Sequence, residues 1–470
     1  MRHETMANRN GTEWRKQAGE KKRPNINRGI APKQTRPKPG VVQPASLKQL
    51  VHIMDPASRF PTPIRPMGAN SASTQCTTAV GGTVVDMINL TDITEITDTT
   101  VTAQAGVTLR ELADELAEQG MEVAGTMDIV TRTVGGAVAG GCFGPVHDGD
   151  TAFIGSQAVA MTVVTPDGKV MRIDETRQNL LNVFRGSMGA LGIILDVTFK
   201  IRPQTTFVLK QRKMDVATFG VAATRLVHQP VGIKFFYLPF KDRVYTALRR
   251  AQPDDDAKVR NFAWKLKDLG ETSVLPAICG KLGRIVPIQS LRYSLVDGLH
   301  EMGQSLFTNT LTEGGSSAAE YMSQSGRYAG PPLEYSTWCF PAQDLGMLLE
   351  AYKVFAAEYY YNFKYRCDMP VVGFRLPQDQ SALLSPSFDG PMFALRVVTS
   401  PHPKWEDYAM DYAEFAQRWG GVPLLNQSRC AEQGQVTIAF GSRLDFFKRI
   451  RRQLDSENRL VNPYLAQYVT

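Results

Sequence analysis

Three stretches of the sequence are rich in glycine and other small residues, and each adjoins a segment with strand composition. They are residues 67–74, 133–144 and 186–192. Small residues let backbone N–H groups approach a ligand closely, and successive N–H groups of this kind bind anions, phosphates above all. One such loop would indicate no more than a tight turn. Three in one region favour a long ligand with a diphosphate in its middle.

Candidate reactive side chains lie in the second half of the chain. Glu334, Ser336 and Trp338 alternate in "EYSTWCF", so they share one face of a predicted strand. Glu334 is a candidate base if that face looks at the ligand, and otherwise a solvated residue at the sheet edge. Arg375 and Arg429 are either two fixed charges that stabilise an oxyanion or a carboxylate, or members of structural ion pairs.

The elements expected around the first three loops are short. Residues 46–54 and 108–120 each begin with a capping box and carry an apolar stripe at helical spacing, which predicts two helices. The segment 157–173 reads as two strands joined by a Pro-Asp-Gly turn. Residues 41–203 therefore follow an α+β pattern. They lack the regular βαβ spacing and the G-x-G-x-x-G and G-x-x-x-x-G-K-[ST] motifs of common nucleotide-binding folds.

The amino-acid composition changes after about residue 206, where aromatic residues become frequent. Residues 345–361 and 407–421 have helical periodicity, whereas 369–376 and 390–400 have strand composition. A second α+β domain with one sheet and covering helices is expected. We therefore divide the chain into a basic arm (1–40), a first domain (41–205), a substrate or cap domain (206–425) and a C-terminal segment (426–470).

Charge and cysteine content limit the possible settings. The chain has 470 residues and a net charge of +7, but residues 1–40 hold eleven Lys and Arg against three Glu, so residues 41–470 carry about −1. The arm is a solvated tail or a contact for an acidic surface, and no nucleic-acid module accompanies it. Six dispersed cysteines without a C-x-x-C pair favour a reducing, cytoplasmic setting without a metal site. No apolar run is long enough to span a membrane.

Three motifs carry a resemblance to a known family. The stretches "PIRPMGANSAST", "TVGGAVAGGCFG" and "GSMGALGIILDVTF", in this order, resemble the FAD-binding domain of the vanillyl-alcohol-oxidase family, the PCMH-type fold. The C-terminal "RRQLDSENRLVNPYL" is similar to the branch of gulonolactone, arabinonolactone and alditol oxidases. The resemblance implies a two-domain α+β fold, with a PCMH-type FAD-binding domain and a substrate domain built on an antiparallel sheet. It also implies an FAD-dependent oxidoreductase, either an oxidase or a dehydrogenase.

The family's motifs imply which residues hold FAD. Backbone amides of the first two loops would line the diphosphate and the flavin. The backbone of Ile194 would contact the adenine or ribityl end of FAD, and the C-terminal segment would close the site. The positions that match are Met67, Gly68, Ala69, Asn70, Ser71, Ala72, Thr133, Val134, Gly135, Gly136, Gly140, Gly141, Cys142, Ile194, Asn462 and Tyr464.

Two departures from the family pattern bear on chemistry. The histidine that often binds the flavin covalently matches Ser71, and residues 53–146 contain no histidine, so non-covalent FAD is expected. The glutamate two residues before Arg375 is replaced by Gly373, and the branch's His-Trp-x-Lys segment matches residues 426–429, which adds Gln427 to the candidates. A substrate other than a simple sugar lactone is therefore expected.

The first hypothesis is hydride transfer from a CH–OH or CH–NH group of a small polar metabolite to flavin N5, with O2 or another electron acceptor. The first alternative is a flavin-dependent rearrangement or cyclisation without net oxidation. The second is a flavin-binding homologue without catalysis. The substrate, the acceptor and the oligomeric state stay open at this stage.

Overall fold

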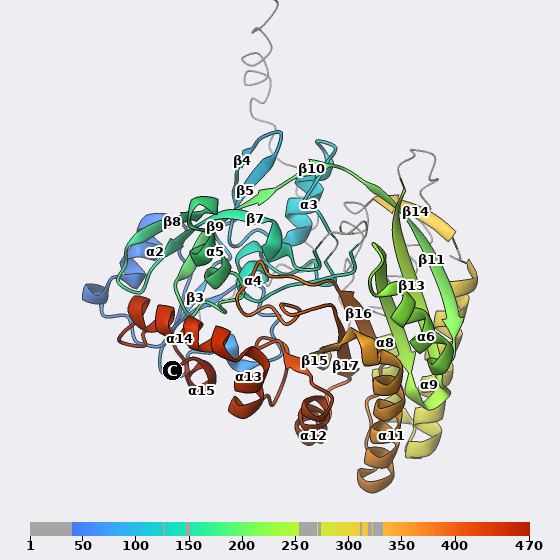
Figure 1. Cartoon of the computed structure of the whole chain (residues 1–470). Coiled ribbons are helices and arrows are strands. Elements are labelled where there is room, and N and C mark those ends of the chain that lie inside the picture. The colour runs from blue at the N-terminus through green and yellow to red at the C-terminus, as the bar shows by residue number, and fades with distance from the viewer. Residues whose placement is uncertain are drawn as a thin grey trace, which may run out of the picture. The chain divides into compact units, whose positions relative to one another are not determined.

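Three larger β-sheets, one two-stranded pair and their surrounding helices make up the described part of the structure, a computed structural model, shown in Figure 1. It describes residues 40–125, 127–146, 151–252, 270, 274–310, 313–317, 322 and 332–470, and every structural statement below concerns these residues. The predicted basic arm lies outside them, apart from Gly40. Residues 37–470 form one compact unit. The domain boundaries at 205 and 425 within that unit stay a prediction.

The first two sheets belong to the N-terminal half. A parallel sheet has the order β1 (Val41–Val42), β3 (Thr83–Asp86), β2 (Ile64–Met67). An antiparallel sheet has the order β4 (Ile93–Ile96), β5 (Thr100–Gln104), β9 (Ile193–Lys200), β7 (Ala158–Val164), β8 (Val170–Asp174). A short pair joins β6 (Met121–Glu122) to β10 (Arg202–Pro203). The predicted hairpin at 157–173 is β7 and β8.

The helices of this half begin where their caps predict. Ser46 caps α2 (Leu47–Met54), and Thr108 with Glu111 forms the capping box of α3 (Leu109–Ala117). A further helix, α5, spans Gln178–Phe184. Neither α5 nor α4 (Val134–Ala139) was predicted. The latter lies inside the second glycine-rich stretch, and the Thr133 hydroxyl accepts a hydrogen bond from the N–H of Gly136 at its start. Tertiary packing overrides the low helix propensity of the two glycines there.

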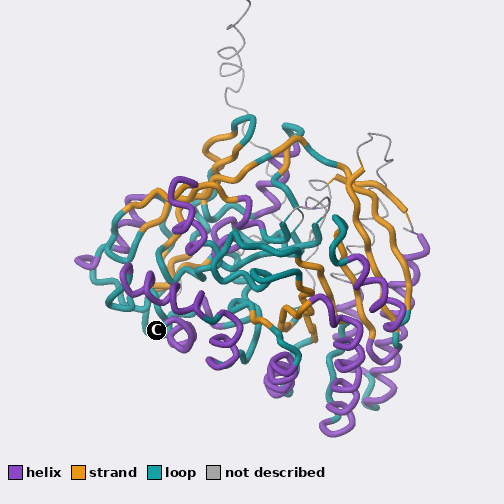
Figure 2. Tube along the Cα trace, viewed as in Figure 1, coloured by secondary structure: helices purple, strands orange, loops and turns teal. Residues whose placement is uncertain are grey.

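A large antiparallel sheet dominates the second half and confirms the predicted sheet of the substrate domain. Its order is β14 (Glu313–Ser317), β11 (Thr206–Met214), β13 (Arg243–Gln252), β12 (Gly232–Leu238), β16 (Val371–Leu376), β17 (Met392–Thr399), β15 (Glu334–Pro341), β18 (Val422–Pro423). Helices lie beside it on both faces, as Figures 1 and 2 help to follow. One face carries α6 (Val216–Leu226), α11 (Leu345–Phe363) and α12 (Trp405–Arg418), and Tyr237 of β12 packs on Tyr352 of α11. The other face carries α9 (Gln289–Thr310) with α8 (Leu275–Ile285) packed on it, and the Tyr245 hydroxyl of β13 is hydrogen-bonded to that of Ser305 in α9.

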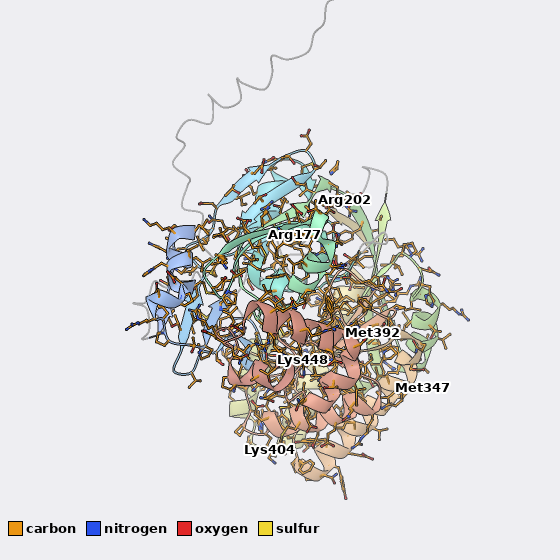
Figure 3. The ribbon with its side chains drawn as sticks, turned by 60° about the vertical axis from the view of Figure 1, so that its left-hand side comes forward. Arg177, Arg202, Met347, Met392, Lys404 and Lys448 are labelled. Atoms are coloured by element: carbon orange, nitrogen blue, oxygen red, sulfur yellow. The ribbon has the colours of Figure 1, made fainter. Side chains whose placement is uncertain are left out.

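Strand alternation gives this sheet two different faces. Phe235 pairs with Gly373 and packs on Phe219 of α6, so these positions face α6. Lys234 pairs with Phe374 on the opposite face, which we call the inner face because it meets residues of the N-terminal half. Figure 3 illustrates the side chains: Met392 of β17 is buried, while Met347 of α11 is 63% exposed.

The C-terminal segment returns to the N-terminal half, as the resemblance implies. It contains α13 (Gln433–Phe440), α14 (Ser442–Leu454) and α15 (Pro463–Val469). The buried Arg65 guanidinium donates to the carbonyl oxygen of Leu460, and Arg459 donates to that of Met54. No helix in the described ranges is long and apolar enough to cross a membrane.

Candidate functional site

The three glycine-rich loops meet along one cleft. It encloses about 780 Å3 of empty space, part of it open to solvent, and Asn426 from the second half closes one side. Eleven of the residues expected to bind FAD line it: Met67, Gly68, Ala69, Asn70, Ser71, Ala72, Thr133, Gly135, Gly136, Gly140 and Ile194. Sequence positions more than a hundred residues apart are therefore brought to one elongated cavity.

The first loop presents a row of free backbone donors to this cleft. None of the N–H groups of residues 68–72 donates a hydrogen bond within the described part of the chain. Asn70 has φ +51°, so the backbone changes hand in the middle of the row. Successive N–H groups around such a change form a concave anion site. The loop is held from outside, because the N–H of Ser73 donates to the carbonyl oxygen of Asn426.

The second loop works differently from the expectation. The N–H groups of Val134, Gly135 and Gly136 donate to Val107 O, Ala105 O and Thr133 Oγ1, so they are not free for a ligand. Their glycines allow close packing: a Cβ on Gly135 would lie 2.7 Å from the Cβ of Ala105. Val134 is fully buried and does not line the cleft. The free amides are thus concentrated in the first loop.

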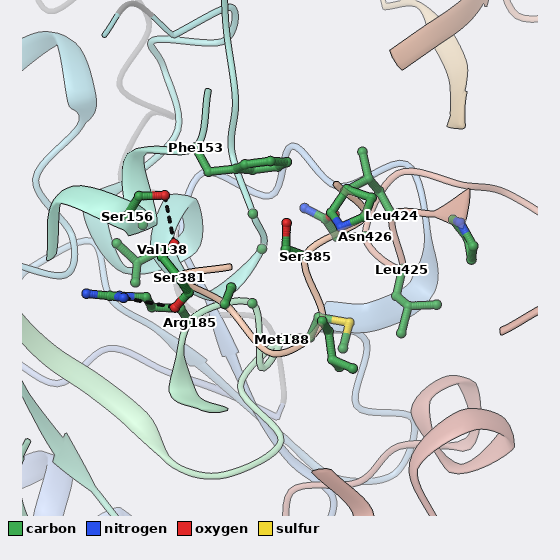
Figure 4. Close-up of a pocket in the computed structure, with 18 of the residues that line it drawn as sticks. Val138, Phe153, Ser156, Arg185, Met188, Ser381, Ser385, Leu424, Leu425 and Asn426 are labelled. Atoms are coloured by element: carbon green, nitrogen blue, oxygen red, sulfur yellow. Dashed lines mark hydrogen bonds between the residues drawn. The ribbon is translucent and has the colours of Figure 1, made fainter. Parts of the chain in front are cut away.

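A second cavity adjoins the cleft and is shown in Figure 4. It encloses about 530 Å3 and shares Gly140, Met188 and Asn426 with the cleft, so the two spaces meet at these residues. Gly141, a predicted cofactor residue, lines it. The Ser385 hydroxyl points into it in Figure 4, Ser385 is 3% exposed, and the hydroxyl has no hydrogen-bond partner among the described residues. An unpaired buried hydroxyl is costly unless a bound molecule satisfies it.

A buried charge cluster occupies the inner face of the large sheet. The Asp128 carboxylate accepts from Lys234 Nζ at 3.2 Å and forms an ion pair with Arg396. All three side chains are at most 15% exposed. Burial alone would raise the pKa of Asp128, but the two cations outweigh it and hold the pKa below its ordinary value. The cluster therefore carries one negative and two positive charges.

Gln427, one of the residues predicted from the sequence, contacts this cluster. Its Oε1 accepts from Arg396 and from Thr337, each at 3.3 Å. Its Nε2 is buried and has no partner in the described residues. Gln427 is fully buried and lines neither cavity, so this amide is an unsatisfied donor inside the cluster.

Tyr335 and Arg132 are site residues that the sequence reasoning missed. The Tyr335 hydroxyl donates to the carbonyl oxygen of Ser71 at 2.6 Å, and Arg132 Nε donates to the Ser71 hydroxyl at 3.2 Å. Arg132 lines the cleft. The alternation of side chains in "EYSTWCF" could have identified Tyr335, because it places Tyr335 and Thr337 on one face of the strand and Glu334 on the other.

The structure does not bring Arg375 or Glu334 to the inner face. Arg375 lies on the face that carries α6 and donates to the carbonyl oxygens of Val227 and Val231, at 2.7 and 3.0 Å. Glu334 pairs with Thr399 and shares its face with Ser336 and Trp338, opposite to Tyr335. These placements contradict the expected positions over the ligand, because each strand has the other face turned inward.

The remaining predicted residues hold the loops from behind. Arg429 donates to Ser73 O at 3.2 Å and pairs with Glu406 of α12. Asn462 donates to the carbonyl oxygens of Gln75 and Thr78, and caps α15. The Tyr464 hydroxyl donates to Leu425 O at 2.6 Å. None of the three lines the cleft. They fix the main chain that does.

Cys142 is fully buried beside Arg132 and lines neither cavity. Arginine favours a thiolate, but burial is the larger effect and raises the pKa of Cys142. The thiol is therefore protonated and unreactive near neutral pH.

Packing explains why residue 373 is a glycine. A Cβ there would lie 2.0 Å from the Phe235 ring, so the glycine makes room for that aromatic side chain. The loss of the family's carboxylate at this position is thus coupled to the packing under α6.

Comparisons with known proteins agree with the fold and with the cleft. The family model described as an FAD binding domain matches residues 38–174. Among solved structures, cholesterol oxidase from Brevibacterium sterolicum superimposes with a TM-score of 0.71 at 13% identity, over 92% of this chain and 94% of that one. The chain has the vanillyl-alcohol-oxidase-type fold.

Curated relatives match over shorter stretches. The L-gulono-1,4-lactone dehydrogenase of Mycobacterium tuberculosis is 24% identical over 253 residues, 53% of this chain and 57% of that protein. The D-arabinono-1,4-lactone oxidase of Kluyveromyces lactis is 29% identical over 172 residues, 34% of this chain and 32% of that protein. The D-lactate dehydrogenase of Anaerostipes hadrus is 30% identical over 36% of this chain and 37% of that protein. The chain thus spans about half or less of these relatives' lengths.

The residues present fit FAD. Five free amides and the Arg132 cation suit a diphosphate in the cleft, and Gly140 and Asn426 lead from there into the second cavity. The donor set is rich in N–H groups, and none of the described residues that line the two cavities is acidic.

Proposed function

We propose that the protein is an FAD-dependent oxidoreductase that removes a hydride from a CH–OH or CH–NH group of a small polar molecule. The observation that carries the proposal is the row of free N–H groups at residues 68–72, facing an elongated cleft between the two halves. FAD, when bound, supplies the acceptor for two electrons. The matching FAD binding domain and the relatives that act as dehydrogenases and oxidases support it.

The side chains of this protein would position the substrate and stabilise charge. Arg396 and Lys234 would lend fixed positive charge to a substrate oxygen as its proton leaves for water, and the Gln427 amide is the unsatisfied donor beside Arg396. Asp128 is held ionised by two cations, so it is a weak proton acceptor and serves to orient them. The inner-face aromatic rings of Phe143 and Phe374 pack beside Arg396 and exclude water.

We further propose that the flavin is not tethered to the chain. Ser71 stands in the position of the family's flavin-linking histidine, and its hydroxyl is engaged with Arg132. A hydroxyl does not form that bond to the flavin ring. Retention then depends on the amides, the packing of the loops and Arg132.

Acid precipitation of the purified yellow protein tests both proposals. Free FAD in the supernatant, with a colourless pellet, is the expected result. A pellet that keeps the colour would overturn the untethered binding, and a colourless protein without releasable FAD would overturn the function.

Anaerobic mixing with candidate substrates tests the reaction. The panel contains gulono- and arabinonolactones, D-lactate, other small alcohols and matching amines. We expect an alcohol or an amine to bleach the flavin. The sugar lactones should be poor substrates, because Gly373 replaces the glutamate of that branch and residues 426–429 replace its His-Trp-x-Lys segment. Turnover without bleaching and without consumption of any acceptor would support a rearrangement instead.

A further inference from the structure

Arg132 is a buried cation without a counter-charge. It is 4% exposed and lines the cleft. Its side chain donates to the hydroxyls of Ser71, at 3.2 Å, and Tyr335, at 3.4 Å, which are neutral groups. Its further neighbour Cys142 is a protonated thiol. No carboxylate of the described residues lies within 4.0 Å of it.

Three other buried arginines among the described residues have a carboxylate or a larger set of acceptors. Arg396 has the Asp128 carboxylate, and Arg366 has Asp297 at 2.7 Å. Arg65 donates to the carbonyl oxygens of Cys76, Gly189, Leu460 and Met188. Burying a charge without such partners destabilises the fold, so a bound anion would offset this cost at Arg132.

Its surroundings indicate an anion. Ser71, its hydrogen-bond acceptor, belongs to the row of free N–H groups at 68–72. On its other side Tyr335 belongs to the inner face that carries Arg396 and the unpaired Gln427 amide. The cleft between them presents donors and positive charge, and a negatively charged oxygen is the ligand group that satisfies both.

We propose that Arg132 binds a negatively charged phosphate or carboxylate oxygen of the molecule in the cleft. The inference rests on the proposed flavin-dependent function. Two sources share this chemistry: the diphosphate of FAD, and a carboxylate of the substrate. In either case Arg132 is a binding residue that compensates for the missing covalent tether or selects acidic substrates.

Stability of the flavin-free full chain separates this role from a structural one. In Arg132→Gln the uncompensated charge is gone, so its flavin-free urea midpoint is expected to equal or exceed that of the wild type. A structural arginine gives the opposite sign. The matched control is Arg172→Gln. Arg172 lies on β8, is half-exposed and pairs with Asp196 at 3.3 Å, so its replacement should leave flavin binding unchanged.

Flavin titration identifies the source of the anion. If the diphosphate is the partner, Arg132→Gln weakens FAD about 10- to 100-fold, as expected for a lost charge-assisted hydrogen bond, leaves riboflavin unchanged, and Arg132→Lys restores part of the affinity. If a substrate carboxylate is the partner, FAD affinity is unchanged and KM rises about 10- to 100-fold for carboxylate substrates but not for their amides.

A lower flavin-free midpoint together with unchanged FAD affinity and KM would overturn the proposal. So would equal weakening of FAD and riboflavin. Release of FAD on acid precipitation is independent of Arg132, so failure of this inference would leave the proposed function standing.

Discussion

Replacing Asp128 by asparagine should reveal how far the inner-face cluster depends on one carboxylate. The substitution keeps the shape of the side chain and leaves Lys234 and Arg396 buried without a counter-charge. Both cations are at most 15% exposed, so water replaces the lost carboxylate poorly. Removing one partner of a buried pair costs about 3–5 kcal/mol. We expect about 3 kcal/mol for Asp128→Asn, because the asparagine oxygen still accepts one hydrogen bond.

Urea unfolding of the purified variant measures this loss, with the midpoint and the slope fitted separately. Asp196→Asn is the matched control. Asp196 pairs with Arg172, whose side chain is 48% exposed, so the control should lose less than about 1 kcal/mol. Combining Asp128→Asn with Lys234→Met removes one charge of each sign and should recover part of the loss. Equal losses in Asp128→Asn and Asp196→Asn would refute the reasoning.

The ion pairs of Asp128 with Lys234 and Arg396 also predict how stability depends on pH. The two cations hold the pKa of Asp128 below its ordinary value, so the stabilisation is complete above a pH of about 4 and falls as pH drops toward the folded-state pKa. The asparagine variant has no such proton to bind. The stability difference between wild type and Asp128→Asn should therefore shrink as the pH falls from about 4 to about 2. A constant difference over that range would contradict an ionised Asp128.

Three further changes test the cavities and the thiol. In Gly140→Ala the new Cβ would lie 2.6 Å from Asn426 Nδ2, where the two cavities meet, so the FAD affinity measured by titration should fall about tenfold. Gly434→Ala is the control, because no heavy atom lies within 4 Å of the new Cβ. This control should keep the FAD affinity and gain up to about 1 kcal/mol of stability. Ser385→Ala removes an unpaired buried hydroxyl, so the flavin-free protein should gain about 1 kcal/mol in urea unfolding; a loss would mean that the hydroxyl has a partner. Cys142 should react with a thiol reagent only after unfolding, because burial raises its pKa, and fast labelling of the native protein would contradict this.

Local sequence patterns predicted much of the architecture. Capping residues marked the starts of α2 and α3, a Pro-Asp-Gly turn marked the β7–β8 hairpin, and small residues marked the loops of the cleft. These signals act over a few residues, because a cap or turn satisfies backbone groups next to it. The glycine-rich motifs also predicted an elongated anion site, and the structure places eleven of the predicted residues around one cleft.

The side of each strand that faces the ligand was decided by tertiary structure. Alternation in sequence gives two faces and does not say which one is turned inward. In β15 the inward face holds Tyr335 rather than Glu334, and β17 supplies Arg396 where β16 turns Arg375 toward the face that carries α6. The helices packed on one side of the sheet make that choice, through contacts such as Phe235 on Phe219.

Which backbone amides stay free was also a tertiary matter. Both glycine motifs looked equally suited to a phosphate in the sequence. Folding pairs the amides of residues 134–136 with Ala105 and Val107, which follow β5, and with Thr133, and leaves those of 68–72 facing the cleft. A sequence specifies where the chain is able to approach a ligand; only the packing of distant segments determines which hydrogen-bonding groups are left for it.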